Sequence, residues 1–327
     1  MLRLHPKQPP VEKALGHSAY AEKSCPQSVA RDTSSLGQLQ IAARNFDRKQ
    51  SVKCRLVPRV ISALVLMLLA TVTVAQTLLQ VVELCNGADR SSPDPQIYGC
   101  TTLIDSGAKP NVLIIAYNNR GDAYIAKGDY DRAIQDFDQS IKLASNNAKA
   151  FNNRGVAYQK KGEYDRAIED FDASIRLDPS YASPFANRAE TYLKKGTYDR
   201  AIRDYDEVIR LQPTWGAVWN GRCWARAIVG ELQAALADCN EALRLEPNVA
   251  AIYDSRGLTY LKLGQLDSAI ADYSSALRFD PKLASSLYGR GLAKLKKGDT
   301  SGGNADIAVA QGVEATIVGR FAQYGVQ

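Results

Sequence analysis

The sequence predicts an all-α protein, an α-α superhelix (solenoid) of about six stacked helix pairs with a capping helix at each end. The main observation is a 34-residue period, in which Asn-Arg-Gly at residues 119–121 returns at residues 153–155. Three residue types keep this period along the chain. They are arginine (Arg120, Arg154, Arg188, Arg222, Arg256, Arg290), glycine (Gly128, Gly162, Gly196, Gly230, Gly264, Gly298) and aspartate (Asp136, Asp170, Asp204, Asp238, Asp272, Asp306).

On its period and residue types the chain resembles the tetratricopeptide repeat (TPR) family. The family pattern places an aromatic, a small residue and a second aromatic on helix A, then alanine, an aromatic and proline on helix B. Small residues let the two helices approach, aromatic residues fill the space between pairs, and proline ends helix B. The resemblance implies a solenoid with a long inner groove. In the second repeat the matching residues are Phe151, Gly155, Tyr158, Ala167, Phe171 and Pro179.

The last of the six expected repeats departs from the pattern. Gly303 replaces the helix B alanine, and Ala315 replaces the proline. Terminal repeats of a solenoid are expected to be atypical, because one side of them meets solvent. The six repeats are placed at residues 114–147, 148–181, 182–215, 216–249, 250–283 and 284–317, within a repeat domain of 114–317.

Capping segments are expected on both sides of the repeats. Residues 76–113 should form an N-terminal cap, because residues 97–106 match the second helix of a repeat. Residues 318–327 should complete a C-terminal capping helix. Three apolar residues at helical spacing support it: Ile317, Val318 and Phe321.

The chain upstream of the repeats has a different composition. Residues 1–59 hold 11 Lys/Arg and 4 Asp/Glu and so carry +7, while the remaining 30 basic and 31 acidic residues sum to −1. The net charge of +6 therefore belongs to this leader, and a near-neutral repeat array gives little electrostatic basis for nucleic-acid binding. Residues 1–55 are expected to be disordered, since they lack apolar periodicity.

An apolar run of 16 residues, 60–75, follows Lys53, Arg55 and Arg59. It is short for a bilayer span and ends in small residues, which favours a secretory signal peptide within residues 56–75. The alternative is a signal anchor, which also places the repeats outside the cytoplasm. Because export signals begin near the N-terminus, we expect residues 1–55 to come from a mis-assigned start.

Cysteine usage is consistent with export. Cys85 and Cys100 bracket a Pro- and Ser-rich loop, and we expect a disulfide between them. Cys223 and Cys239 occupy the small position of helix A and the aromatic position of helix B in the fourth repeat. As small buried hydrophobes these two are expected to be unbridged core residues, with a bridge as the alternative. The other two cysteines, Cys25 and Cys54, lie in the leader.

The arginine and aspartate series are expected to pair. The arginine lies between the aromatic and small positions of helix A, where the repeat consensus has leucine, so it should be nearly buried. A buried charge must be paired, and the aspartate series supplies one partner per repeat. We expect a structural column of ion pairs that fixes the stacking register. Spacing leaves open whether the partner belongs to the same repeat or to a neighbouring one.

The residue inventory argues against an enzyme. The only histidines are His5 and His17, so the exported part has none, which excludes His-dependent triads and His-ligated zinc. The sequence has no CxxC pair and no phosphate-binding loop of the Walker type. We therefore expect no catalytic residue, no metal and no cofactor.

The resemblance narrows to a group of exported bacterial tetratricopeptide proteins, over about residues 85–327. It rests on Tyr-Asp-Arg-Ala-Ile at residues 130–134, 164–168 and 198–202, and on the glycine-rich stretch from Gly289. The resemblance implies a non-catalytic scaffold that binds a protein or peptide, in the periplasm or after secretion. The alternative is a membrane-tethered factor for envelope assembly or maintenance.

Helical phase places the second, fifth, ninth, twelfth and thirteenth residues of each repeat on the groove. In repeats two and three these are polar, whereas in repeats four to six they form an apolar strip edged by lysines, which is typical of an interaction site. The alternative is that the strip packs between neighbouring helices or under the C-terminal cap. The expected groove residues are Asn152, Lys160, Lys194, Asn220, Trp224, Leu258, Leu261, Lys262, Tyr288, Leu292, Leu295 and Lys296.

The assignment of the leader can be tested on the native protein. Mass spectrometry of the N-terminus should find a mature chain that lacks residues 10–50, because the signal peptide would be removed. A mature protein that contains those residues would contradict the assignment.

Overall fold

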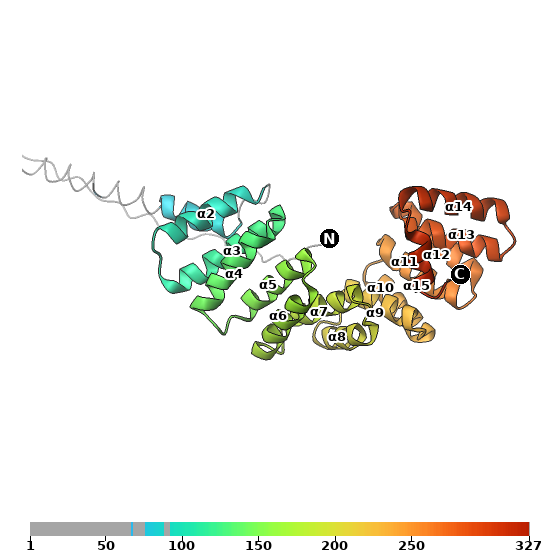
Figure 1. The fold of residues 1–327 in the computed structure, drawn as a ribbon, viewed down its shortest axis with the longest axis horizontal. Helices are drawn as coiled ribbons and strands as arrows, with labels where there is room; N and C mark the ends of the chain where they lie inside the picture. Colours follow the sequence, from blue (N-terminus) through green and yellow to red (C-terminus); the bar gives the residue numbers. More distant parts are fainter. Residues whose placement is uncertain (1–66, 68–75, 88–91, 327) are drawn as a thin grey trace, which may run out of the picture. The chain divides into compact units, whose positions relative to one another are not determined.

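The computed structural model describes residues 67, 76–87 and 92–326 of the chain. Within these residues every regular element is a helix, and the predicted fold class is confirmed (Figure 1). Apart from Met67, the expectations for residues 1–75 fall outside the described residues. A helical segment, residues 76–85, comes first. The following helices are α2 (Asp94–Asp105), α3 (Pro110–Lys127), α4 (Tyr130–Leu143), α5 (Ala148–Lys161), α6 (Tyr164–Leu177), α7 (Ala182–Lys194), α8 (Tyr198–Leu211), α9 (Gly216–Val229), α10 (Leu232–Leu245), α11 (Ala250–Lys262), α12 (Leu266–Phe279), α13 (Ala284–Lys296), α14 (Thr300–Val313) and α15 (Ile317–Gln323).

Helices α3 to α14 pack as six successive pairs, α3 with α4 through α13 with α14. The local sequence explains each helix. In α8 the buried residues Ala201, Asp204, Tyr205 and Val208 recur at helical spacing, while the intervening charged residues are exposed. The glycine series ends helix A: Gly162, after α5, has a φ of 83°, a left-handed conformation that favours glycine. No helix of the described residues is long and apolar enough to cross a membrane.

A small residue on helix A faces an aromatic ring on helix B, 16 positions later in the sequence. A Cβ atom placed on Gly155 would lie 2.7 Å from the ring of Phe171, and one on Gly121 would lie 2.6 Å from Phe137. Both rings are fully buried. The two helices therefore approach so closely that no larger residue than glycine fits without displacing a ring in the core.

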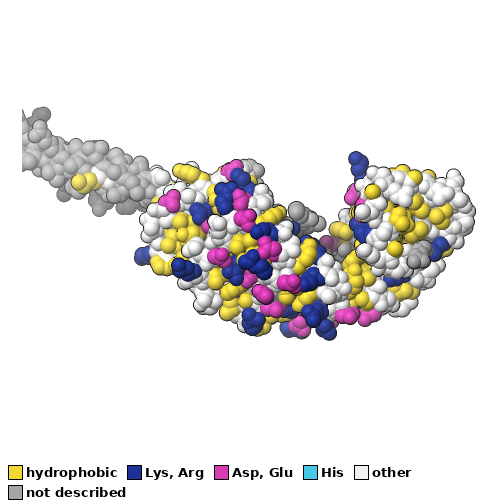
Figure 2. Space-filling view, viewed as in Figure 1, with side chains coloured by type: hydrophobic (Ala, Val, Ile, Leu, Met, Phe, Trp, Pro, Cys, Tyr) yellow, Lys and Arg dark blue, Asp and Glu magenta, His cyan; other side chains and the backbone are white. Residues whose placement is uncertain are grey.

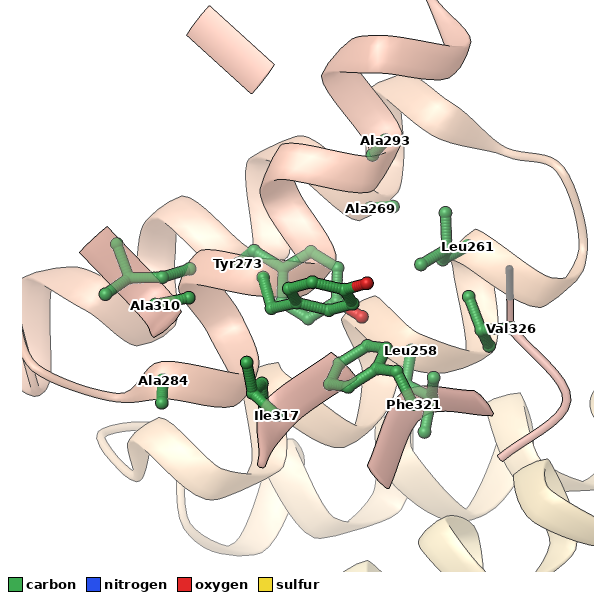
Figure 3. Close-up of a cluster of buried hydrophobic side chains, with 12 residues drawn as sticks. Leu258, Leu261, Ala269, Tyr273, Ala284, Ala293, Ala310, Ile317, Phe321 and Val326 are labelled. Atoms are coloured by element: carbon green, nitrogen blue, oxygen red, sulfur yellow. The ribbon is translucent and has the colours of Figure 1, made fainter. Parts of the chain in front are cut away.

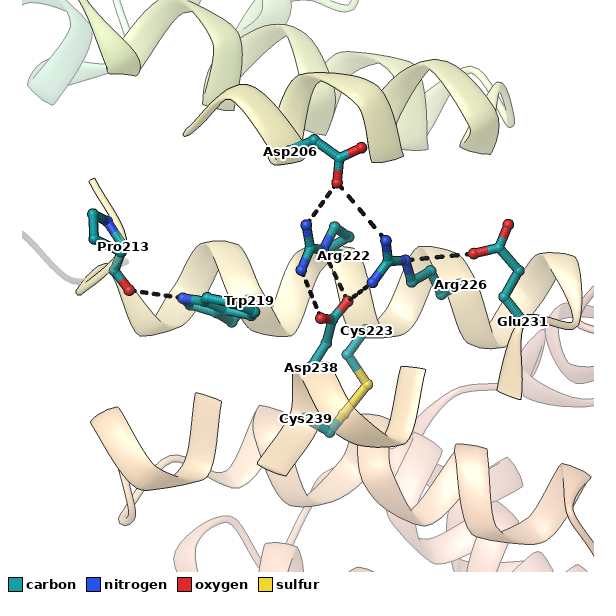
Figure 4. Close-up of polar contacts among 9 residues, drawn as sticks. All are labelled: Asp206, Pro213, Trp219, Arg222, Cys223, Arg226, Glu231, Asp238 and Cys239. Atoms are coloured by element: carbon teal, nitrogen blue, oxygen red, sulfur yellow. Dashed lines mark hydrogen bonds and ion pairs between the residues drawn. A yellow bond between two sulfur atoms is a disulfide. The ribbon is translucent and has the colours of Figure 1, made fainter. Parts of the chain in front are cut away.

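The fourth repeat replaces this small-aromatic contact by a disulfide between Cys223 and Cys239, both fully buried (Figure 4). The expectation of two unbridged cysteines is therefore wrong. The physical reason is that the small position of helix A faces the aromatic position of helix B. The two Cα atoms lie 5.4 Å apart, within the range that a disulfide spans.

A second disulfide joins Cys85 to Cys100, so the helical segment 76–85 is cross-linked to α2. The two helices touch at their backbones, because a Cβ on Gly99 would lie 2.7 Å from the amide nitrogen of Cys85. The carbonyl oxygen of Cys85 accepts hydrogen bonds from Gln96 and from Asn119 on α3, at 3.3 and 3.1 Å. These contacts tie residues 76–87 and α2 to the first helix of the first repeat.

The contribution of the fourth-repeat disulfide to stability can be tested by giving this repeat the glycine and the aromatic residue that other repeats carry. Replacing both cysteines by alanine should lower the free energy of unfolding by about 3 kcal/mol for the lost cross-link, and further for the cavity. The double substitution Cys223→Gly/Cys239→Phe should recover part of this loss, because it rebuilds the small-aromatic contact. Urea unfolding of the three proteins measures the difference. Equal stability of the two double variants would contradict this account.

Candidate peptide-binding groove

Helix A of each repeat, the odd-numbered helices α3 to α13, forms one face of the array. Each odd-numbered helix contacts the next odd-numbered one, whereas among the described residues the even-numbered helices α4 to α14 do not contact each other. Helices that converge on one side and diverge on the other make the converging side concave. We call the face formed by α3, α5, α7, α9, α11 and α13 the groove.

The C-terminal half of the groove is covered by the chain itself. Three residues of the expected apolar strip are buried against apolar side chains of residues 317–326, a stretch here called the C-terminal segment (Figure 3). The prediction of an exposed strip is therefore wrong, because periodicity identifies a helix face but not what returns to cover it. The strip residues are Leu258, Leu261 and Tyr288, and the covering residues are Ile317, Phe321 and Val326.

Trp224 and Lys262 also contact the C-terminal segment. The Trp224 ring meets the Tyr324 ring edge-on, with centroids 5.3 Å apart. The Lys262 ammonium donates hydrogen bonds to the carbonyl oxygen of Tyr324 at 2.9 Å, and to two carbonyl oxygens at the end of α9 at 2.7 and 3.2 Å. Burial lowers the pKa of Lys262 below its ordinary value.

The remaining expected residues of this half differ in their surroundings. Leu292 is partly buried and packs against the same apolar cluster. Leu295 lies against Gly303 on α14, so it packs inside its own repeat and does not face the groove. Lys296 is exposed.

In the N-terminal half, polar side chains form hydrogen bonds between neighbouring odd-numbered helices. Asn187 on α7 donates to the side-chain oxygen of Asn152 on α5 at 2.9 Å. Gln159 on α5 donates to the Thr191 hydroxyl at 2.8 Å. Both Asn152 and Gln159 are buried. The groove phase predicted Asn152, but the part played by Asn187 was missed, although Asn119, Asn153 and Asn187 recur at 34 residues and could have signalled it.

Two lysines remain exposed on this half of the groove, Lys160 at the end of α5 and Lys194 at the end of α7. Glu190 lies between them. Glu190 is exposed, and partial desolvation raises its pKa against the opposing effect of the two lysines. The groove therefore presents a carboxylate and two ammonium groups close together.

Two asparagines of the groove hold side-chain oxygens that are buried and have no hydrogen-bond partner among the described residues. They belong to Asn118 on α3 and Asn220 on α9. Asn220 was expected on the groove, and Asn118 occupies the same position of the first repeat. A buried acceptor without a partner costs free energy.

The arginine series makes bidentate ion pairs with aspartates of the same repeat. In the third repeat, the Nε and Nη2 atoms of Arg188 donate to the two carboxylate oxygens of Asp204 at 2.8 and 2.7 Å. All six arginines make this paired contact, and all six aspartates are buried. The pairs are Arg120–Asp136, Arg154–Asp170, Arg188–Asp204, Arg222–Asp238, Arg256–Asp272 and Arg290–Asp306.

Each arginine also reaches the preceding helix pair through its remaining Nη1 atom. Arg154 donates to Asp138 at 2.6 Å, and Arg222 donates to Asp206 at 2.6 Å (Figure 4). Arg188 makes the equivalent contact with Asp172. For the arginines of the first, fifth and sixth repeats, the group that accepts from Nη1 is neutral. These groups are Asn240 for Arg256, Ser274 for Arg290 and Thr101 for Arg120.

The described residues hold no group of three or more His, Cys, Asp or Glu side chains that could bind a metal ion. On the face in Figure 2, basic and acidic side chains lie interspersed over the repeats, without a patch of one sign. The observed chemistry of the groove is therefore that of a surface for hydrogen bonds, ion pairs and apolar contacts.

Comparison with known proteins identifies the repeats. Tetratricopeptide repeat family models match residues 121–162, 148–181, 187–250 and 257–298, together about half of the chain. No curated protein matches the chain.

Among solved structures, a tetratricopeptide repeat protein from Parabacteroides merdae ATCC 43184 is 17% identical over 75% of this chain and 99% of its own, with a TM-score of 0.57. A chain of the APC/C hetero-tetramer Cut9-Hcn1 is 16% identical over 75% of this chain and 51% of its own, with a TM-score of 0.56. YrrB, a TPR protein with an unusual peptide-binding site, is 20% identical over 55% of this chain and 92% of its own, with a TM-score of 0.46. At these identities the likenesses show the fold alone.

The ion pairs can be tested in the third repeat. Arg188→Ala should lower the free energy of unfolding by about 3 kcal/mol or more, because it leaves Asp204 buried without its cation. Arg210→Ala is the matched control: it removes an exposed pair with Glu207, and should cost less than about 1 kcal/mol. Chemical unfolding followed by circular dichroism measures both. Similar losses for the two variants would contradict a buried ion-pair column.

Proposed function

Because this chain belongs to the tetratricopeptide repeat family, we propose that it is a non-catalytic scaffold that binds a peptide or protein segment along its groove. Stacked helix pairs present a long concave surface, and such surfaces bind extended partners. One observation carries the proposal: among the described residues, Lys160, Glu190 and Lys194 are exposed on the groove helices of repeats two and three.

This part of the groove favours an extended segment with acidic side chains. Lys160 and Lys194 can each pair with a carboxylate of the ligand, and Glu190 between them can pair with a cationic or hydroxyl group. The proposed binding surface therefore lies in repeats two and three, where the sequence indicated a polar groove.

We place this scaffold in an oxidising compartment, the bacterial periplasm or the exterior. Both disulfides lie within the exported part of the chain, Cys85–Cys100 in the N-terminal cap and Cys223–Cys239 in the fourth repeat. Disulfides persist in oxidising environments and are rare in the cytosol. The apolar run at residues 60–75 supplies a matching export signal.

The proposed groove can be tested with selected peptides. Peptides from a random displayed library that bind the wild-type chain should be rich in Asp and Glu. The double variant Lys160→Glu/Lys194→Glu should bind them at least about tenfold more weakly, because it replaces two attractive charges by repulsive ones. Fluorescence anisotropy with labelled peptides measures the affinity.

The matched control is Lys142→Glu/Lys282→Glu, which makes the same charge change at exposed lysines on α4 and on the loop after α12. Its affinity should equal that of the wild type. Equal binding by the groove variant and the control variant would remove repeats two and three from the proposed site.

A further inference from the structure

The C-terminal segment lies across the groove rather than extending the stack. Its helix α15 contacts α13 and α14, and the residues after it turn back toward earlier repeats. Tyr324 contacts Trp224 on α9, and its carbonyl oxygen accepts a hydrogen bond from Lys262 on α11. A cap that only closed the last helix pair would not need to reach α9. The segment therefore spans the groove faces of repeats four to six.

The surface under the segment carries charges that a permanent core would avoid. Among the described residues neither Lys262 nor Asp254 forms an ion pair, although both are partly buried, and the Arg320 charge on α15 acts on Asp254 from a longer distance. Lys262 binds carbonyl oxygens only, and the Asp254 carboxylate accepts from the hydroxyls of Ser285 and Ser286 at 2.9 and 2.5 Å. Lysine and aspartate are mostly exposed in folded proteins, so their place beneath a chain segment is unusual for a core. This pattern is typical of a surface that meets a peptide, with apolar contacts and a hydrogen bond to its backbone.

The segment itself is weakly built. Its helix α15 has seven residues, and isolated helices of this length are marginal in water. Gly319 lies within this helix, where glycine lowers helix stability relative to alanine. A Cβ on Gly319 would meet no atom within 4 Å, so packing does not require glycine there. Only Ile317, Phe321 and Val326 are buried, while Val318 and Gly319 face solvent.

We propose that the groove of α9, α11 and α13 is a second peptide-binding site, which the chain's own C-terminal segment occupies until a partner segment of the same chemistry replaces it. This proposal deepens the scaffold function proposed above and rests on it. The partner segment carries aromatic and apolar side chains at the spacing of Ile317, Phe321, Tyr324 and Val326, and presents a backbone carbonyl to Lys262. An acidic side chain near that carbonyl would pair with the same ammonium group.

The probe for this site is a fluorescein-labelled synthetic peptide of residues 314–327. The protein is the full chain, as wild type and as the variant Phe321→Ala/Val326→Ser, which weakens the contacts that hold the segment in place. Fluorescence anisotropy should show that the variant binds the peptide at least about tenfold more tightly than the wild type, because its groove is more often open. A peptide that carries Phe321→Ala and Tyr324→Ala should not bind.

A third protein, Gly319→Ala, should favour the state in which the C-terminal segment occupies the groove. Alanine stabilises α15 without a clash, so this variant should bind the labelled peptide more weakly than the wild type. A misfolded protein would not explain this result, because the substitution favours the native helix.

Three results would overturn the proposal. The first is equal binding of the peptide by the wild type and the weakened variant, and the second is no binding by either protein. The third is a loss of helical circular dichroism in the weakened variant, because the segment would then be part of the core. Lys160→Glu/Lys194→Glu should leave this binding unchanged. The surface of repeats two and three is tested by its own peptides, so the two proposals fail separately.

Discussion

The six arginines of the 34-residue period are the constraint on which the rest of the array depends. A guanidinium group at a position where leucine is usual cannot be buried alone, because desolvation of an unpaired charge costs several kcal/mol, as an order of magnitude. Each arginine satisfies this requirement twice, with an aspartate of its own repeat and with an acceptor of the preceding helix pair. The planar group has donors on both sides, so one side chain fixes a helix pair internally and also fixes its register on its neighbour.

The sequence predicted this column because a buried charge requires a partner, but spacing alone could not tell which repeat supplies it. Helices of the same repeat and of the preceding repeat both lie beside helix A, and both supply acceptors to the arginine. The cysteines of the fourth repeat show the same limit. The sequence places Cys223 and Cys239 at the small and aromatic positions, yet it favours two unbridged residues over the bridge that the structure has. Its geometry follows from the Gly155–Phe171 type of contact in the other repeats, which periodicity does not reveal.

The groove illustrates what periodicity can and cannot provide. Helical phase identified Asn152, Trp224 and Lys262 as residues of one face, since that face follows from 3.6 residues per turn. It left open whether a ligand or the C-terminal cap covers the face, because the covering residues lie outside the repeats and the contact depends on the path of the chain after α14. The apolar strip of repeats four to six is therefore matched by the chain's own aromatic segment, while Lys160 and Lys194 of the polar half are exposed among the described residues. One array thus offers two surfaces of different chemistry.

The most direct test of the ion-pair column is a double-mutant cycle across two repeats. The four proteins are the wild type, Arg188→Leu, Asp172→Asn and the double variant, and urea unfolding gives the free energy of each. If Arg188 joins the third repeat to the second, the coupling energy between these two side chains should be about 1 kcal/mol or more. A coupling energy below about 0.3 kcal/mol would contradict the account, since the losses would then simply add.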